Sequence, residues 1–208
     1  MQVVILCGGR GTRIRGEVSV PKPMVPIGGF PILWHIMKTY SHFGHKDFIL
    51  CLGYKGWEIK QFFMNYQAFT NDVTVHFGER SRVEFAELRN EVGWKVTLAE
   101  TGLNAMTGAR VKRIEKYITG DEFMLTYGDG VGDIDLDGLV RFHRQHGKIA
   151  TLTGVEPPGR FGDLRMKGDQ VTEFIEKPQI SGTLINGGYF VLNRRVFDYI
   201  EDREDQMF

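Results

Sequence analysis

Glycines, arginines and a threonine follow directly after the first apolar run of the sequence. The run Val3–Leu6 predicts a short buried strand, and residues 8–13 read Gly-Gly-Arg-Gly-Thr-Arg. Glycine lets backbone N–H groups approach anionic oxygens without interference from a Cβ atom, while arginine and threonine add charge and a hydroxyl. The chemistry that this loop could carry is the binding of phosphate groups. A tight structural turn with solubilising arginines would use the same residue types.

Two familiar phosphate-binding loops have a different spacing. The dinucleotide fingerprint is Gly-x-Gly-x-x-Gly leading directly into a helix, with an acidic residue about 20 positions on. Here arginines stand inside the loop and that acidic residue is missing. The Walker A loop ends in Gly-Lys-Ser/Thr, which is also absent. A dinucleotide-binding oxidoreductase is therefore disfavoured.

Two further charged residues stand in rigid surroundings. Lys22 lies between Pro21 and Pro23, which fix the backbone around a single ammonium group. Asp129 lies between glycines at the end of the apolar run Phe123–Thr126. A carboxylate at the end of a strand suits Mg²⁺, a hard cation that prefers carboxylate and phosphate oxygens. A surface lysine and an ordinary Asp-Gly turn are the alternatives.

Residues suited to a sugar phosphate occur later in the chain. Glu176 and Lys177 end a predicted strand, where a carboxylate can accept hydrogen bonds from hydroxyls and an ammonium can meet a phosphate. Asn186 and Gly187 precede another strand, and an amide beside glycine can bind hydroxyls at close range. An exposed Glu-Lys pair at a sheet edge would have no such role.

The elements that must position these residues alternate between strands and helices. Apolar spacing predicts strands, helices and one insertion or hairpin at residues 78–94. The predicted strands are Val3–Leu6, Asp47–Leu52, Val73–Phe77, Lys95–Ala99, Glu122–Thr126, Ala150–Val155, Gln170–Glu176 and Tyr189–Leu192. The predicted helices are Ile32–Phe43, Trp57–Tyr66, Ala105–Tyr117, Leu136–His146 and Arg195–Ile200. This alternation indicates an α/β fold with a mostly parallel sheet.

The bulk properties exclude several classes of protein. The chain has 208 residues, and its 26 basic and 26 acidic residues balance, which gives no support for nucleic-acid or membrane-surface binding. Cys7 and Cys51 lie in apolar runs and are expected to be core residues in a reduced, cytoplasmic protein. No apolar run is long enough to cross a bilayer. The acids at 133, 135 and 137 lack the closing glutamate of a calcium loop, so they are interpreted as helix-start acids.

Several motifs together resemble one enzyme family. Residues 8–13, Pro21-Lys22-Pro23-Met24 and the Gly-Gly-x-Pro-Ile-Leu run at 28–33 resemble the signature of sugar-phosphate nucleotidyltransferases. Further similarity at 34–37, 53–56, 106–108, 126–131, 157–162 and 185–188 points to the branch that forms CDP-glucose from CTP and glucose 1-phosphate. The resemblance spans essentially the whole chain. It implies a single Rossmann-like, three-layer α/β/α domain with a mostly parallel mixed sheet.

The resemblance also assigns roles to individual residues. It implies that Arg13 and Lys22 act on the phosphates during catalysis and that Asp129 binds Mg²⁺. It implies a nucleotide site made of Leu6, Cys7, Gly8, Gly9, Arg10, Gly11, Thr12, Arg13, Lys22, Ala105, Arg110 and Gly128. It implies a sugar-phosphate site made of Glu176, Lys177, Asn186 and Gly187. Ala105 and Ala109 depart from the family pattern, which leaves UTP, dTTP or another hexose 1-phosphate as alternative substrates.

The resemblance raises two further expectations. Members continue beyond the position of Phe208 with a second metal-binding aspartate, so a C-terminal segment of the family is expected to be missing here. A catalytically weak homologue that binds nucleotide therefore remains an alternative. A homo-oligomer that uses no nucleic-acid or membrane partner is expected.

Overall fold

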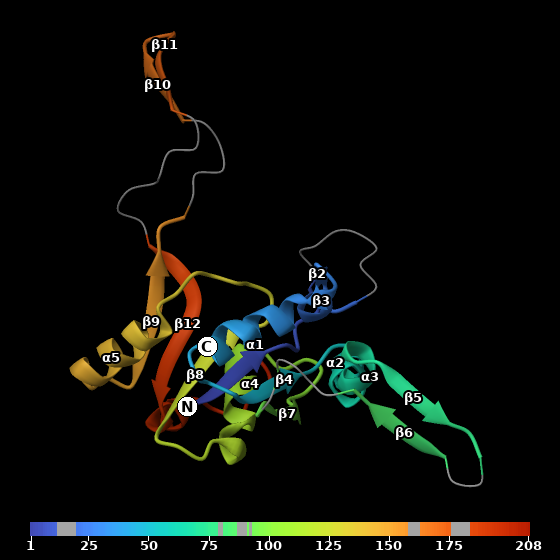
Figure 1. Ribbon diagram of the computed structural model, residues 1–208. Coiled ribbons are helices and arrows are strands. Elements are labelled where there is room, and N and C mark those ends of the chain that lie inside the picture. Colours follow the sequence, from blue (N-terminus) through green and yellow to red (C-terminus); the bar gives the residue numbers. More distant parts are fainter. Residues whose placement is uncertain (12–19, 79–80, 87–90, 92, 158–162, 176–183) are drawn as a thin grey trace.

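The computed structural model describes residues 1–11, 20–78, 81–86, 91, 93–157, 163–175 and 184–208. This part of the chain is built around a six-stranded sheet with the spatial order β7-β4-β1-β8-β12-β9 (Figure 1). The strands are β1 Gln2–Leu6, β4 Asp47–Leu52, β7 Lys95–Glu100, β8 Glu122–Tyr127, β9 Ala150–Val155 and β12 Ile185–Asn193. Strands β7, β4, β1 and β8 are parallel neighbours, whereas β12 runs antiparallel between β8 and β9. The predicted mostly parallel mixed sheet is therefore confirmed.

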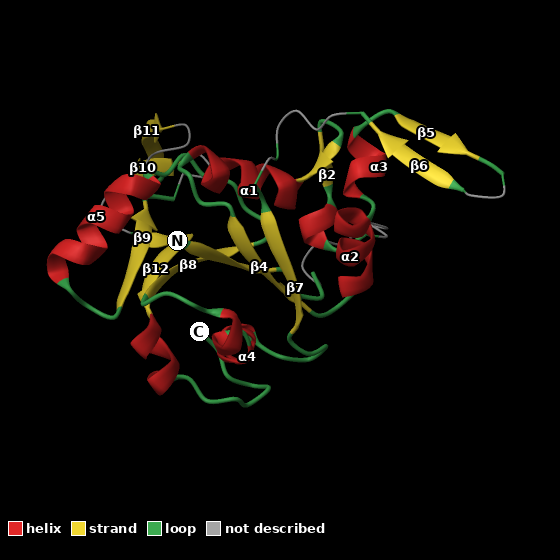
Figure 2. Cartoon of the chain, turned by 60° about the horizontal axis from the view of Figure 1, so that its bottom comes forward, coloured by secondary structure: helices red, strands yellow, loops and turns green. Residues whose placement is uncertain are grey.

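Both faces of this sheet are covered, because its central strands are apolar on both sides. Val3 and Ile5 belong to one core and Val4 to the other, as the alternation of side chains along a strand requires. Figure 2 shows helices on both sides of the sheet. The first core includes residues of α1 Ile32–His42, α2 Gly56–Met64 and α5 Leu136–His146. The second includes residues of α4 Thr107–Arg113 and of the 3-10 helix η3 Arg194–Tyr199, and Tyr117 of the 3-10 helix η2 Glu115–Tyr117 packs against it.

Smaller elements complete the described chain. The 3-10 helix η1 spans Lys22–Met24, and α3 spans Tyr66–Thr70. Three antiparallel pairs stand apart from the main sheet. They are β2 Pro26–Ile27 with β3 Phe30–Pro31, β5 Val73–His76 with β6 Arg82–Phe85, and β10 Asp163–Lys167 with β11 Gln170–Ile175. Among the described residues, no helix is long and apolar enough to cross a membrane.

Several sequence predictions need correction at the ends of elements. The predicted helix Trp57–Tyr66 is divided between α2 and α3 at Asn65, whose side-chain amide donates to the carbonyl of Gln61 at 2.8 Å. Asparagine ends helices in this way because its side chain competes for backbone hydrogen bonds. The predicted insertion or hairpin at 78–94 is confirmed only in part, because β6 lies in this range whereas its partner β5 corresponds to the predicted strand Val73–Phe77.

Two other predicted elements have different bounds. Helix α4 begins at Thr107 rather than at Ala105, because Met106 is extended and its N–H donates to the carbonyl of Glu204 at 2.7 Å. Strand β12 begins at Ile185 rather than at Tyr189, so Asn186 and Gly187 lie within the strand and not before it. The alternating pattern missed this start because the register shifts between residues 186 and 190.

Candidate active site

The topology creates a crevice where the loop after β1 meets the loop after β8. From β1 the chain continues into β4 on one side, while β8 pairs on the other side of β1. Ligands of open α/β sheets bind in such a crevice, beyond the carboxyl ends of the strands. A cavity of about 310 Å³ lies at this point. Its lining residues are Leu6, Cys7, Gly8, Gly9, Gly11, Lys22, Pro23, Ala105, Met106, Thr107, Arg110, Tyr127, Asp129 and Met207.

Glycine occupies positions 9 and 11 of the first loop for different structural reasons. Gly11 has φ +67, a backbone conformation that favours glycine, and a Cβ there would lie 3.2 Å from Cγ of Lys22. No described atom lies within 4 Å of the place where a Cβ of Gly9 would stand, so among the described residues nothing keeps a ligand from its backbone. Thr12 and Arg13, which the sequence also assigned to this loop, lie outside the described residues.

A cation and a carboxylate meet at the cavity. Lys22 is held by η1, in which the N–H of Met24 donates to the carbonyl of Pro21 at 2.8 Å. Asp129 follows Gly128, whose N–H donates to the carbonyl of Leu6 at 3.0 Å. Nζ of Lys22 lies 3.6 Å from Oδ2 of Asp129, and the two side chains are 25% and 46% exposed. The structure thus brings together two residues that are 107 positions apart and keeps both accessible.

Gly128 is part of this arrangement without lining the cavity. A Cβ at this position would stand 2.8 Å from the carbonyl oxygen of Leu6 and 3.1 Å from Sγ of Cys7. Glycine is therefore required for the loop after β8 to pack against the loop after β1. Cys7 itself is buried, and burial raises the pKa of its thiol well above the ordinary value. Both cysteines are free and buried, as the sequence predicted.

The opposite wall of the cavity comes from residues 104–110 and from the C-terminal segment. Nη2 of Arg10 donates to Oδ1 of Asn104 at 2.7 Å, which links the glycine loop to this wall. Ala105 and Thr107 contribute small side chains, and Met207 lies beside them. Arg10 and Ala105 were predicted from the sequence, whereas Asn104 and Met207 were not.

Arg110 lies beneath the cavity and is only 4% exposed. Its guanidinium donates to Gly8 and to residues at the ends of two other strands. Burial lowers the pKa of this guanidinium. The sequence prediction placed Arg110 in the nucleotide site, and the side chain does line the cavity.

The predicted sugar site is described in part. Nδ2 of Asn186 donates to the phenol oxygen of Tyr127 at 3.2 Å, and Tyr127 lines the cavity. Oδ1 of Asn186 accepts from the N–H of Gly188 at 2.8 Å, which fixes the amide. A Cβ at Gly187 would lie 2.7 Å from Oγ1 of Thr153, so the strand packs closely there. Glu176 and Lys177 lie outside the described residues.

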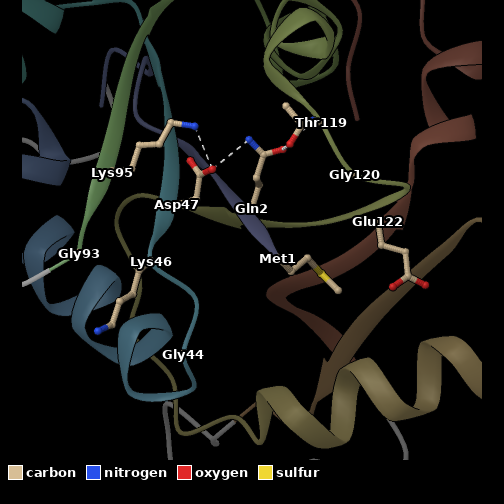
Figure 3. A pocket seen from close by; sticks show the side chains of 10 residues that line it. All are labelled: Met1, Gln2, Gly44, Lys46, Asp47, Gly93, Lys95, Thr119, Gly120 and Glu122. Carbon is tan, nitrogen blue, oxygen red and sulfur yellow. Dashed lines mark hydrogen bonds and ion pairs between the residues drawn. The ribbon is translucent and has the colours of Figure 1, made fainter.

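A second cavity of about 420 Å³ lies near the amino ends of β1, β4, β7 and β8 (Figure 3). Its charged groups are partly engaged with one another, because Asp47 accepts from Lys95 at 3.1 Å and from Gln2 at 3.4 Å. Gln2 is also bonded to the backbone of residues 117 and 119. The carboxyl ends of the strands, where the glycine loop lies, are the usual ligand side of such a sheet. The first cavity is therefore the candidate active site.

Comparison with known proteins shows the family to which the chain belongs. A family model described as nucleotidyl transferase matches residues 2–207. The chain belongs to the nucleotidyl transferase family. It is 54% identical over 204 residues to a glucose-1-phosphate cytidylyltransferase of Salmonella typhimurium, covering 97% of this chain and 79% of the relative. It is 43% identical over 210 residues to a probable glucose-1-phosphate cytidylyltransferase of Bacillus subtilis, covering 100% of this chain and 81% of the relative.

The fold of this nucleotidyl transferase also has solved counterparts. The crystal structure of HddC from Yersinia pseudotuberculosis, complexed with GMP-PN, superposes with a TM-score of 0.65 at 26% identity. The similarity covers 100% of this chain and 89% of HddC. The three-layer arrangement expected from the sequence is thus that of known nucleotide-binding proteins.

Proposed function

We propose that the chain transfers the cytidylyl group of CTP to glucose 1-phosphate, forming CDP-glucose and pyrophosphate with Mg²⁺. The observation that carries the proposal is the accessible pair of Lys22 and Asp129, 3.6 Å apart beside the glycine loop. The named activity of the Salmonella typhimurium relative supports the choice of both substrates. UTP, dTTP or another hexose 1-phosphate are the alternative substrates.

In the proposed reaction, a phosphate oxygen of glucose 1-phosphate attacks the α-phosphorus of CTP. The new oxygen–phosphorus bond forms while the bond to the leaving pyrophosphate breaks in line. Gly9, Gly11 and Lys22 line the cavity. In the proposed complex the amides of the two glycines bind the phosphates, and the ammonium of Lys22 offsets the negative charge that develops on the α-phosphate oxygens. No protein nucleophile is required, and the raised pKa of Cys7 leaves little thiolate for such a role.

Asp129 fits the requirements of a magnesium ligand. Its carboxylate is 46% exposed at the cavity and provides the hard oxygen donors that Mg²⁺ prefers. The described residues contain no group of three His, Cys, Asp or Glu side chains that could enclose a metal. Mg²⁺ is usually held by one or two carboxylates together with substrate phosphates and waters, so one aspartate is compatible with binding. Bound Mg²⁺ would supply charge neutralisation and orientation of the phosphates.

The test is pyrophosphate release measured with glucose 1-phosphate and each of CTP, UTP, dTTP and GTP. We expect CTP to give the highest kcat/KM and omission of Mg²⁺ to abolish turnover. Lys22→Met should lower kcat by ~10²–10³-fold, the usual cost of losing one group that stabilises transition-state charge. Lys116→Met, which removes a lysine placed over the ring of Tyr117 and outside the cavity, is the matched control. Binding of CTP without pyrophosphate release from any sugar phosphate would favour the weak homologue instead.

We also propose that the protein is a homo-oligomer. The hairpin β5–β6 projects from the body (Figure 1). In its register Val73 faces Phe85 and Val75 faces Val83, so these four side chains share one face and are 38–51% exposed. An apolar face of this kind on a projecting hairpin is suited to contact with a second copy.

Light scattering coupled to size-exclusion chromatography tests this proposal. Val75→Lys changes the apolar face of the hairpin, whereas Thr74→Lys places the same charge on its other face. We expect Val75→Lys to lower the molar mass and Thr74→Lys to leave it unchanged. A wild-type protein that elutes with the mass of one chain would contradict the proposal.

A further inference from the structure

One buried guanidinium connects the loops that follow three adjacent strands. Nη1 of Arg110 donates to the carbonyl of Leu52 at the end of β4, at 2.9 Å. It also donates to Oγ1 of Thr101 at 2.9 Å and to the carbonyl of Gly102 at 2.8 Å, both directly after β7. Nη2 donates to the carbonyl of Gly8 after β1, at 2.9 Å. A single side chain therefore links the carboxyl ends of β1, β4 and β7, in addition to backbone bonds such as the one from the N–H of Tyr54 to the carbonyl of Gly8 at 3.1 Å.

The charge of Arg110 is compensated by the backbone rather than by an acid. Among the described residues, no carboxylate forms an ion pair with this guanidinium. A buried cation is costly unless hydrogen bonds satisfy it, and here three carbonyl oxygens and one hydroxyl do so. The planar fork of arginine can contact several acceptors at once, which the ammonium of lysine cannot reproduce.

The side chain of Arg110 leaves no room for a Cβ atom at two positions. A Cβ at Gly8 would lie 2.1 Å from Nη1 of Arg110, and a Cβ at Gly53 would lie 2.4 Å from the same atom. Real Cβ atoms essentially never come so close, so both positions exclude a side chain while Arg110 is in place. At Gly9, in contrast, no atom of the described residues lies within 4 Å of the place where a Cβ would stand. The two glycines thus have different roles, because Gly8 makes room for the side chain of Arg110 whereas Gly9 leaves its backbone accessible.

We propose that Arg110 is a positioning residue of the phosphate-binding loop. By holding the carbonyl of Gly8 down, it keeps the amides of residues 9–11 directed at the cavity, so it contributes to nucleotide binding through the loop. This role is separate from any direct contact that Arg110 makes with a ligand, and it rests on the proposed nucleotide site. It predicts that disturbing the guanidinium from outside the cavity weakens binding of the nucleotide.

Gly53 and Thr101 allow that disturbance, because neither lines the cavity. Gly53→Ala places a methyl group against Nη1, and Thr101→Val removes the hydroxyl that accepts from Nη1 and itself donates to the carbonyl of Leu52. Gly78→Ala is the matched control, since no atom of the described part of the chain lies within 4 Å of its Cβ position. Thermal melts and far-UV circular dichroism identify a variant that fails to fold, and the two variants perturb the guanidinium independently.

The measurements are calorimetric titration with CTP and Mg²⁺, and hydrogen exchange of the amides of residues 9–11 in the protein without nucleotide. We expect Gly53→Ala and Thr101→Val each to weaken CTP binding by about tenfold, the value of one hydrogen bond to a charged group, and to speed exchange in the loop. The KM for glucose 1-phosphate should change far less. Wild-type affinity and wild-type exchange in both folded variants would overturn the proposal. If the wild-type protein binds no nucleotide, the proposed function fails, while the exchange data still decide whether Arg110 holds the loop.

Discussion

The C-terminal segment packs so closely against helix α4 that one methyl group should displace it. Residues 204–208 pair with the start of α4, where the N–H groups of Gly108 and Ala109 donate to the carbonyl of Gln206 at 2.9 and 3.2 Å. A Cβ at Gly108 would stand 2.7 Å from the carbonyl oxygen of Met207 and 2.9 Å from that of Gln206. Both neighbours are backbone atoms, so Gly108→Ala can be accommodated only if the segment moves.

The size of the effect follows from the bonds at risk. Three backbone hydrogen bonds, donated by Met106, Gly108 and Ala109, contribute about 3 kcal/mol together, at roughly 1 kcal/mol each. Alanine in a helix gains about 1 kcal/mol over glycine, which offsets part of the loss. We therefore expect Gly108→Ala to lower the free energy of unfolding by about 2 kcal/mol, and more if the contact of Phe208 with Phe190 is also lost.

Urea unfolding and hydrogen exchange measure this prediction. The amides of Met106, Gly108 and Ala109 donate to the segment, so their exchange should accelerate in Gly108→Ala. Gly78→Ala should change the free energy of unfolding by less than about 0.5 kcal/mol, as is usual at open surface positions. The reasoning is refuted if the two variants are equally stable and the three amides exchange at wild-type rates.

Three further outcomes are expected. Burial raises the pKa of Cys7 well above its ordinary value and that of Cys51 to about 12, so iodoacetamide at pH 8 should modify both thiols only after unfolding in urea, as mass spectrometry would detect. Burial lowers the pKa of His143, so on acidification the histidine of the unfolded state is protonated before that of the folded state. The free energy of unfolding should therefore fall as the pH drops below about 6.5, the ordinary pKa of histidine. His143→Gln should reduce this pH dependence, as measured by urea unfolding at pH 7.5 and 5.5. Phe197→Ala removes a buried ring and should cost about 3–4 kcal/mol of unfolding free energy, whereas Phe142→Ala at an exposed position should cost under about 1 kcal/mol.

The parts of the site that a sequence can predict are those built from neighbouring residues. The loop at 8–11 follows a strand of apolar residues, and glycine with arginine in that place indicates phosphate binding without knowledge of the fold. Asp129 was recognisable for the same reason, since glycines on both sides and an apolar strand before it mark a strand end. Parallel pairing of β1 with β8 then brings both to one edge of the sheet.

The parts that could not be predicted depend on contacts between distant segments. Met207 reaches the cavity because backbone bonds hold residues 204–208 against α4, and backbone groups carry no signal in the sequence. Arg110 occupies a helix that could equally present it to solvent, and its burial follows from carbonyls supplied by three separate strands. The start of β12 at Ile185 was missed because a shift of register hides the alternation of its side chains.

The order of strands in the sheet has a consequence for folding during synthesis on the ribosome. Strand β1 emerges first but lies in the interior of the sheet, and its partners β4 and β8 begin at Asp47 and Glu122. A nascent chain that has not yet reached β8 leaves at least one edge of this apolar strand unpaired, and such an edge is prone to aggregate. Because residues from 6 to 207 line the cavity, a nucleotide can be captured there only after residue 207 has been synthesised. Nucleotide binding would then stabilise only chains in which all these segments have folded together.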